Sequence, residues 1–177
     1  MSFSTLDEWQ KFIDGLSLKA GVVEIVALKF RRAQKIYFLG WIDADLIKAG
    51  ELVALTALEL ALKDRYGARM KRSGGKSSLR DLLKYMVDSD GLTDDQIPMY
   101  KKCSGSIVAN LYETDAARKA RKGTFISPPI TLAEIRNSQA HGDPFDGLLW
   151  SGLLELVRDL IDYTYRGANR NERLPTP

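Results

Sequence analysis

The sequence predicts an all-α fold, a bundle of four to five main helices with additional short helices. Three observations predict it. Apolar residues recur at helical spacing through most of the chain, helix-capping residues precede several of these stretches, and no alternating series indicates a sheet. The chain of 177 residues, 45% hydrophobic and 28% charged, is long enough for one globular domain with a substantial core.

Two helices are expected in the first 40 residues. A short amphipathic pattern runs from residue 4 or 5 to residue 13. Residues 22–30 are apolar and β-branched, so periodicity alone fits either a strand or a helix. The charged and polar residues that continue toward Phe38 favour the helix.

A longer helix is predicted over residues 44–66, where apolar side chains recur at helical spacing without a proline. Gly50 weakens its interior slightly. Gly67 stands where a C-cap glycine is expected to end it, and a loop is expected over residues 71–76. The next helix is expected to begin after Ser78 and to end at residues 88–91.

Four further helices are expected. Residues 93–96 offer a helix start, with Gln at the third helical position, and residues 107–120 are expected to form another helix. The capping box at residues 131–134 begins a helix that residues 142–144 stop. The clearest pattern is the last helix, an apolar stripe over residues 145–164. Polar and charged residues lie opposite that stripe: Ser151, Glu155, Arg158, Asp159 and Asp162.

We therefore divide the chain into three parts. Residues 1–35 are expected to form an N-terminal helical extension and residues 36–166 the main helical domain. Residues 167–177, which hold several charged residues and two prolines, are expected to be a flexible tail.

Charge and composition limit the location and the classes of function. The net charge is only +3, and no stretch is long and apolar enough to span a membrane. Cys103 is the single cysteine, and the N-terminus lacks the features of a signal peptide, so a cytoplasmic location without disulfides is expected. One His and one Cys do not supply a zinc cluster, and no metal or other cofactor is expected.

Basic residues gather in two groups, either of which suits contact with a phosphate backbone. Solvated helix faces and loops are the simpler explanation of the same residues. The first group supplies the candidates for RNA binding, which are Arg65, Arg69, Lys71, Arg72 and Lys76, with Arg80 nearby. The second group contains Lys101, Lys102, Arg118, Lys119, Arg121 and Lys122.

Two catalytic or binding motifs receive little support. The sequence at residues 74–77, Gly-Gly-Lys-Ser, is similar to the end of a phosphate-binding loop. However, Met70 occupies the position of the first required glycine, and a helix precedes the loop instead of a strand. A Ser-His-Asp triad built on His141 lacks the glycine pattern that usually surrounds the nucleophile.

The remaining chemistry converges on the end of the helix that begins at residue 131. Asn137 and His141 are four residues apart and share a helix face, with Arg136 beside them. A cation, an amide and an imidazole are therefore expected around one solvent-accessible helix end.

These residues resemble the signature of the HEPN superfamily, in which Arg and a polar residue, often Asn, precede His, frequently as R-N-x-x-A-H-G. Here the segment reads Ile135-Arg136-Asn137-Ser138-Gln139-Ala140-His141-Gly142. The helix at residues 57–66 also resembles the acidic-centred helix of prokaryotic members. The resemblance is specific over about ten residues and compatible over about residues 40–166.

The resemblance implies a helical bundle that dimerises so that two Arg/His motifs meet in a cleft. Many members are metal-independent endoribonucleases in host defence, toxin–antitoxin or RNA-processing systems, where an antitoxin or sensor protein is a partner. Others bind nucleotides or serve as scaffolds. In the branch paired with small nucleotidyltransferases, a Tyr stands two residues after the His; here Asp143 stands there, which argues against that branch.

The chemistry suits a ribonuclease. The 2′-OH of RNA is a built-in nucleophile, so the enzyme must move protons and stabilise charge on the phosphate. His141 is expected to be the acid or base, and Arg136 to hold the phosphoryl oxygens. Asn137 is expected to orient His141 or the phosphate. Because the chain holds one His, a homodimer is expected to supply both acid and base. Glu59 is a supporting candidate: a partly buried carboxylate that pairs with Arg136 or forms an ordinary salt bridge.

Three hypotheses follow. The first is a HEPN endoribonuclease that acts on RNA as a cytoplasmic homodimer. The second is a non-catalytic HEPN module that binds a nucleotide, RNA or a protein partner. The third is an unrelated helical interaction protein with a coincidental motif.

Overall fold

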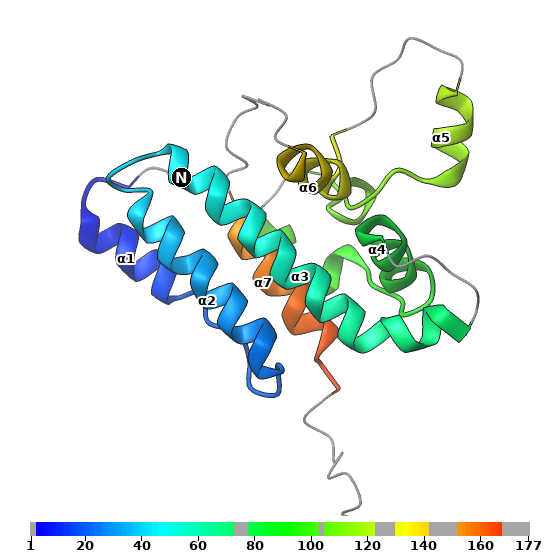
Figure 1. Cartoon of the computed structure of the whole chain (residues 1–177), viewed down its shortest axis with the longest axis horizontal. Helices are drawn as coiled ribbons and strands as arrows, with labels where there is room; N and C mark the ends of the chain where they lie inside the picture. Colours follow the sequence, from blue (N-terminus) through cyan, green and yellow to red (C-terminus); the bar gives the residue numbers. More distant parts are fainter. Residues whose placement is uncertain (1–2, 73–77, 103–104, 123–129, 142–151, 168–177) are drawn as a thin grey trace, which may run out of the picture. The chain divides into compact units, whose positions relative to one another are not determined.

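In the computed structural model the regular secondary structure of the described residues is helical, with no strand among them, so the all-α prediction is confirmed (Figure 1). Contacts divide the chain into two compact units. The first unit contains residues 1–65 and 149–177, and the second contains residues 66–148. The structure describes residues 3–72, 78–102, 105–122, 130–141 and 152–167.

The first unit begins with α1 (Leu6–Asp14), which packs on α2 (Glu24–Leu39). Thr5 caps α1 by accepting a hydrogen bond from the amide of Glu8. The Trp9 indole N–H donates to the carbonyl oxygens of Tyr37 and Phe38 at 3.0 and 3.2 Å, which fixes α1 against the end of α2. The preference for a helix over residues 22–38 is confirmed.

The long helix α3 (Asp45–Arg72) approaches α2 closely at Gly50. A Cβ built on Gly50 would lie 2.5 Å from the Tyr37 ring, so only glycine leaves space for that ring. The Tyr37 hydroxyl is buried near Glu51, and this burial raises the pKa of Tyr37 above its ordinary value. The glycine that weakens the helix locally therefore allows close packing between two helices.

The prediction that Gly67 ends this helix is wrong. The helix continues to Arg72, and Gly67 is not among the glycines with a positive φ. Met70, one turn beyond Gly67, is buried and anchors the extra turn. Lys71 and Arg72, expected in a loop, are helical, while residues 73–77 lie outside the described residues.

The first unit is completed by α7 (Leu153–Thr164), which begins after Gly152 in a left-handed conformation with φ of 101°. Both faces of α7 are buried, so the polar face that the sequence places opposite the apolar stripe is not directed to solvent. Among its acids, Asp159 forms an ion pair with Arg158 at 2.7 Å, and Asp162 accepts a hydrogen bond from the Lys19 amide at 2.9 Å. Periodicity alone did not reveal that these acids have partners inside the unit.

The second unit is built from shorter elements, α4 (Leu79–Asp88), α5 (Asp115–Arg121) and α6 (Leu132–Ala140). Ser78 caps α4 and Thr131 caps α6, as predicted. Three 3₁₀ helices lie between α4 and α5: η1 (Asp94–Gln96), η2 (Pro98–Lys102) and η3 (Val108–Asn110).

Two expectations for this stretch need correction. Residues 107–120 do not form one helix, because Thr114 caps a new helix, α5, after the end of η3. The helix start at residues 93–96 is present, and the Thr93 amide donates to the Gln96 side chain at 2.9 Å, but it yields a single 3₁₀ turn.

The structure provides two further observations on the domain and membrane expectations. The boundary predicted at residue 35 falls within α2, and the division into three parts stays a prediction. In the described part of the chain, no helix is long and apolar enough to cross a membrane.

Candidate functional site

The candidate site is carried by α6, whose first turn is fixed and whose last turn is open. The Thr131 hydroxyl accepts a hydrogen bond from the Glu134 amide at 3.3 Å, and Leu132 and Ala133 are buried. The Ala133 amide donates to the Leu111 carbonyl at 3.2 Å, which joins the start of α6 to the end of η3. Burial at one end therefore holds the helix while the other end reaches solvent.

The last turn of α6 presents the three motif residues. His141 is the C-cap, and its amide donates to the carbonyl oxygen of Asn137 at 3.0 Å. Both side chains are exposed, and Arg136 is half-buried. The expected helix-end position of His141 is confirmed, while Gly142 and Asp143 lie outside the described residues.

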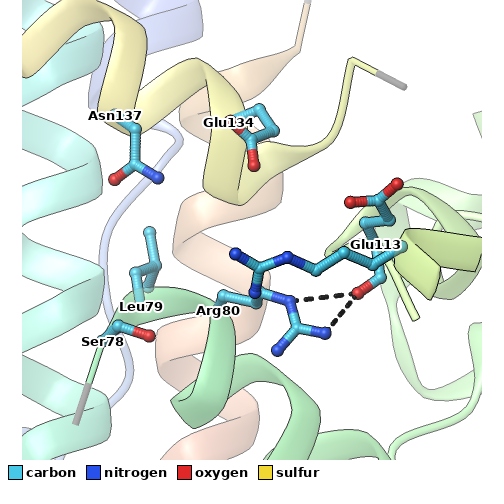
Figure 2. Close-up of a pocket in the computed structure, with 7 residues that line it drawn as sticks. Ser78, Leu79, Arg80, Glu113, Glu134 and Asn137 are labelled. Carbon is cyan, nitrogen blue, oxygen red and sulfur yellow. Dashed lines mark hydrogen bonds between the residues drawn. The ribbon is translucent and has the colours of Figure 1, made fainter. Parts of the chain in front are cut away.

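A hollow of about 210 Å³ in the second unit lies beside α6. Of the motif residues that the structure describes, Asn137 lines it, and Figure 2 shows Asn137 and Glu134 extending from α6 above the start of α4. The lining residues are Ser78, Leu79, Arg80, Glu113, Arg118, Glu134 and Asn137.

Arg80 forms one rigid wall of this hollow. Its Nε and Nη2 donate to the Glu113 carbonyl oxygen at 3.1 and 2.8 Å (Figure 2), and Nη2 also reaches Asp115 Oδ1 at 2.6 Å. Lys84 pairs with the same carboxylate. The hydrogen bonds from Lys84 and Arg80 lower the pKa of Asp115 to about 2.

The second arginine of the hollow, Arg118 on α5, is exposed, and its side chain makes no hydrogen bond or ion pair with the described residues. The two arginines therefore differ in what they offer to a ligand. Arg80 is already committed to a carbonyl and a carboxylate, whereas Arg118 keeps its donors available for an anionic group.

Glu59 lies on α3 in the first unit and is nearly buried. Its Oε1 accepts from Lys63 Nζ at 2.6 Å, an ion pair between residues one helical turn apart. This ion pair offsets part of the free-energy cost of burying the charged carboxylate. The suggested pairing with Arg136 stays a prediction.

The RNA-binding candidates on α3 have different surroundings. Arg65 is half-buried and lies over the Tyr165 ring, 5.6 Å from its centroid, and so contributes to packing. Arg69 is exposed. The backbone of Lys71 and Arg72 is helical, while Lys76 lies outside the described residues.

The sequence did not single out Ser78, Glu113 or Glu134 as lining residues of a site. Ser78 and Glu134 were recognisable only as helix-capping residues, and Glu113 follows no motif.

Over the described ranges, no group of three or more His, Cys, Asp or Glu side chains is arranged to hold a metal ion. No protein-family model, curated protein or solved structure matches this chain.

Proposed function

We propose that this protein is a metal-independent endoribonuclease of the HEPN type that cleaves RNA. The observation that supports the proposal most strongly is the end of α6, where Asn137 and His141 are exposed together beside Arg136. A defence or toxin–antitoxin setting, with an antitoxin or sensor as regulator, is part of the same proposal.

The reaction needs no cofactor because RNA supplies the nucleophile. A base removes the proton of the 2′-OH, the 2′-oxygen bonds to phosphorus, and the bond from phosphorus to the 5′-oxygen breaks. An acid gives a proton to that leaving oxygen. His141 performs one of these transfers, and the guanidinium of Arg136 neutralises the charge that develops on the phosphoryl oxygens.

The amide of Asn137 has two uses in this scheme. Asn137 is one turn before His141 on the same helix, which allows it to orient the imidazole, and its side chain also lines the hollow. A neighbouring nucleotide in that hollow would meet Arg118, whose donors suit a phosphate.

The single histidine of the chain makes a homodimer part of the proposal. Two copies of the α6 end facing one another would supply one imidazole as base and the other as acid. In this arrangement, excess His141→Ala chains mixed with the wild type form mixed dimers and lower the activity per wild-type chain.

The test is cleavage of single-stranded RNA in EDTA by purified wild type, Arg136→Ala and His141→Ala. His141→Ala is expected to lose roughly 100- to 10,000-fold in rate. Ala120→Ser, at an exposed position of α5 outside the motif, is the control and should keep full activity. Equal cleavage by wild type and His141→Ala would refute catalysis by this site.

Binding measurements separate an enzyme from a binding module. If the site is catalytic, His141→Ala should bind RNA as the wild type does while failing to cut it. An Arg136→Ala chain that loses RNA binding, together with a wild type that binds but never cleaves, would instead assign this site to binding alone. Cleavage by a monomer would overturn the two-copy arrangement.

A further inference from the structure

The second helix carries apolar side chains on two opposite faces. The inner face of α2 is buried and faces the core of the first unit through Val26, Phe30, Ala33 and Tyr37. In Figure 1, α2 lies beside α1 and α3 within this unit, in agreement with the contacts of Trp9 and Gly50. These neighbours account for the inner face alone.

The outer face of α2 exposes large apolar residues in a regular stripe. Ile25 is 63% exposed, Leu28 49%, Leu39 44% and Ile42 83%. Ile42 follows the end of the helix, but its amide donates to the Leu39 carbonyl at 2.9 Å, so the chain still turns in a helical manner there. Ile25 and Leu28 are three residues apart and form an apolar patch at one end of the stripe. Leu39 and Ile42 have the same spacing and form a second apolar patch at the other end.

Basic residues occupy the centre of this stripe. Arg32 and Lys35 continue its spacing of three and four residues between Leu28 and Leu39, and Arg31 lies next to them. All three are exposed, and within the described residues none of their side chains forms a hydrogen bond or an ion pair. The outer stripe, defined as Ile25, Leu28, Arg32, Lys35, Leu39 and Ile42, is therefore apolar at both ends and cationic in the middle.

We propose that the outer stripe of α2 is a docking surface for an amphipathic helix of another protein, with apolar residues at both ends and acidic residues at its centre. Charge complementarity identifies this occupant: carboxylates opposite Arg32 and Lys35 pair with cations whose side chains have no partner among the described residues. The apolar ends supply the burial that makes the contact stable. The proposal goes beyond the ribonuclease and does not depend on it.

A second copy of the chain fits the stripe less well. Antiparallel pairing about a two-fold axis matches Ile25 with Ile42 and Leu28 with Leu39, but it places Arg32 opposite Lys35 twice. Four cations then meet at the centre of the contact, where like charges repel. An anionic membrane is also disfavoured, because interfacial helices segregate their basic residues from the apolar face, and here they lie within it.

Synthetic peptides test the proposal. One helical peptide of about 20 residues carries leucines at the four apolar positions and glutamates between them; a second carries lysines in place of the glutamates. The wild-type protein is expected to bind the acidic peptide at least about tenfold more tightly in low salt, as measured by fluorescence anisotropy. The preference should weaken as salt is raised.

Variants of the full chain make the test specific. Leu28→Glu and Ile42→Glu should each weaken binding of the acidic peptide by about tenfold or more. Ile130→Glu changes an isoleucine of similar exposure in the second unit and should leave binding unchanged. The double variant Arg32→Glu, Lys35→Glu should reverse the preference between the peptides.

Three outcomes would overturn the proposal. The first is equal binding of both peptides, or a preference that survives the double charge reversal. The second is a dimer, seen by sedimentation, that Ile42→Glu dissociates and Ile130→Glu does not. The third is binding to vesicles of phosphatidylcholine and phosphatidylglycerol that the same Ile42→Glu variant abolishes.

Discussion

In the first unit, α7 is enclosed along nearly its whole length, whereas in the second unit α6 buries only its first turn. The acids of α7 are buried with partners inside the unit, for example Asp162 with the Lys19 amide. The polar residues at the end of α6 instead reach solvent. Polar side chains thus help to hold the first unit together, while in the second unit a fixed helix start presents polar groups at a free helix end.

If tight packing governs the first unit, adding a methyl group there should be costly. Gly50→Ala places a Cβ against the Tyr37 ring and is expected to lower the free energy of unfolding by about 1–3 kcal/mol, measured by urea unfolding. Gly67→Ala is the control within the same helix, because its Cβ would meet nothing within 4 Å. That change should stabilise the protein by about 0.5–1 kcal/mol, and destabilisation by both would contradict the comparison.

In the second unit, a smaller effect is expected from Arg80, which joins α4 to the start of α5. Arg80→Lys keeps the charge but loses the paired hydrogen bonds to the Glu113 carbonyl. We expect a loss of about 1–2 kcal/mol and faster amide exchange over residues 114–121. Arg118→Lys, at an exposed arginine without such contacts, should change neither quantity. An unaltered exchange rate in Arg80→Lys would show that other contacts hold α5.

The smallest effect concerns the buried acids of the first unit. Burial raises the pKa of Asp162, so its folded-state pKa lies above the unfolded value. The contribution of the Asp162 carboxyl to the free energy of unfolding is fully present when the pH is below the unfolded-state pKa. It is lost as the pH rises through the folded-state pKa. Asp162→Asn keeps an acceptor for the Lys19 amide and does not ionise.

As the pH is raised from about 3.5 to about 7, the free energy of unfolding of Asp162→Asn should therefore increase relative to that of the wild type. The increase should be no more than about 1 kcal/mol. Urea unfolding at both pH values measures the change. Asp14→Asn, at an exposed aspartate, is the control and should show no such gain. A gain that is equal at the two pH values would exclude ionisation of Asp162 as its cause.

The helix starts and the all-α class could be predicted because they depend on local chemistry. Thr5, Ser78 and Thr131 cap helices through contacts three residues away, which a sequence pattern records. The interior of the first unit could not be predicted in the same way. Whether Asp162 faces solvent depends on Lys19, 143 residues distant, and the role of Gly50 depends on a ring from another helix.

The candidate site shows the same division. The position of Asn137 and His141 at the end of α6 follows from a capping box and helical spacing. The hollow beside Asn137 depends on α4, α5 and Glu113, which approach one another through the contacts of Arg80. Spacing along one helix holds no information about such an arrangement.

The enclosure of α7 also has a consequence for the order in which the chain is made. The ribosome synthesises α1, α2 and the first-unit part of α3 before the second unit and α7 after it, although all of these segments belong to the first unit. The second unit is contiguous, over residues 66–148, and emerges within that interval. Because α7 supplies much of the buried core of the first unit, this unit closes only after the second has been synthesised. During translation, the apolar side chains that α7 covers stay exposed until residues 153–164 have been synthesised.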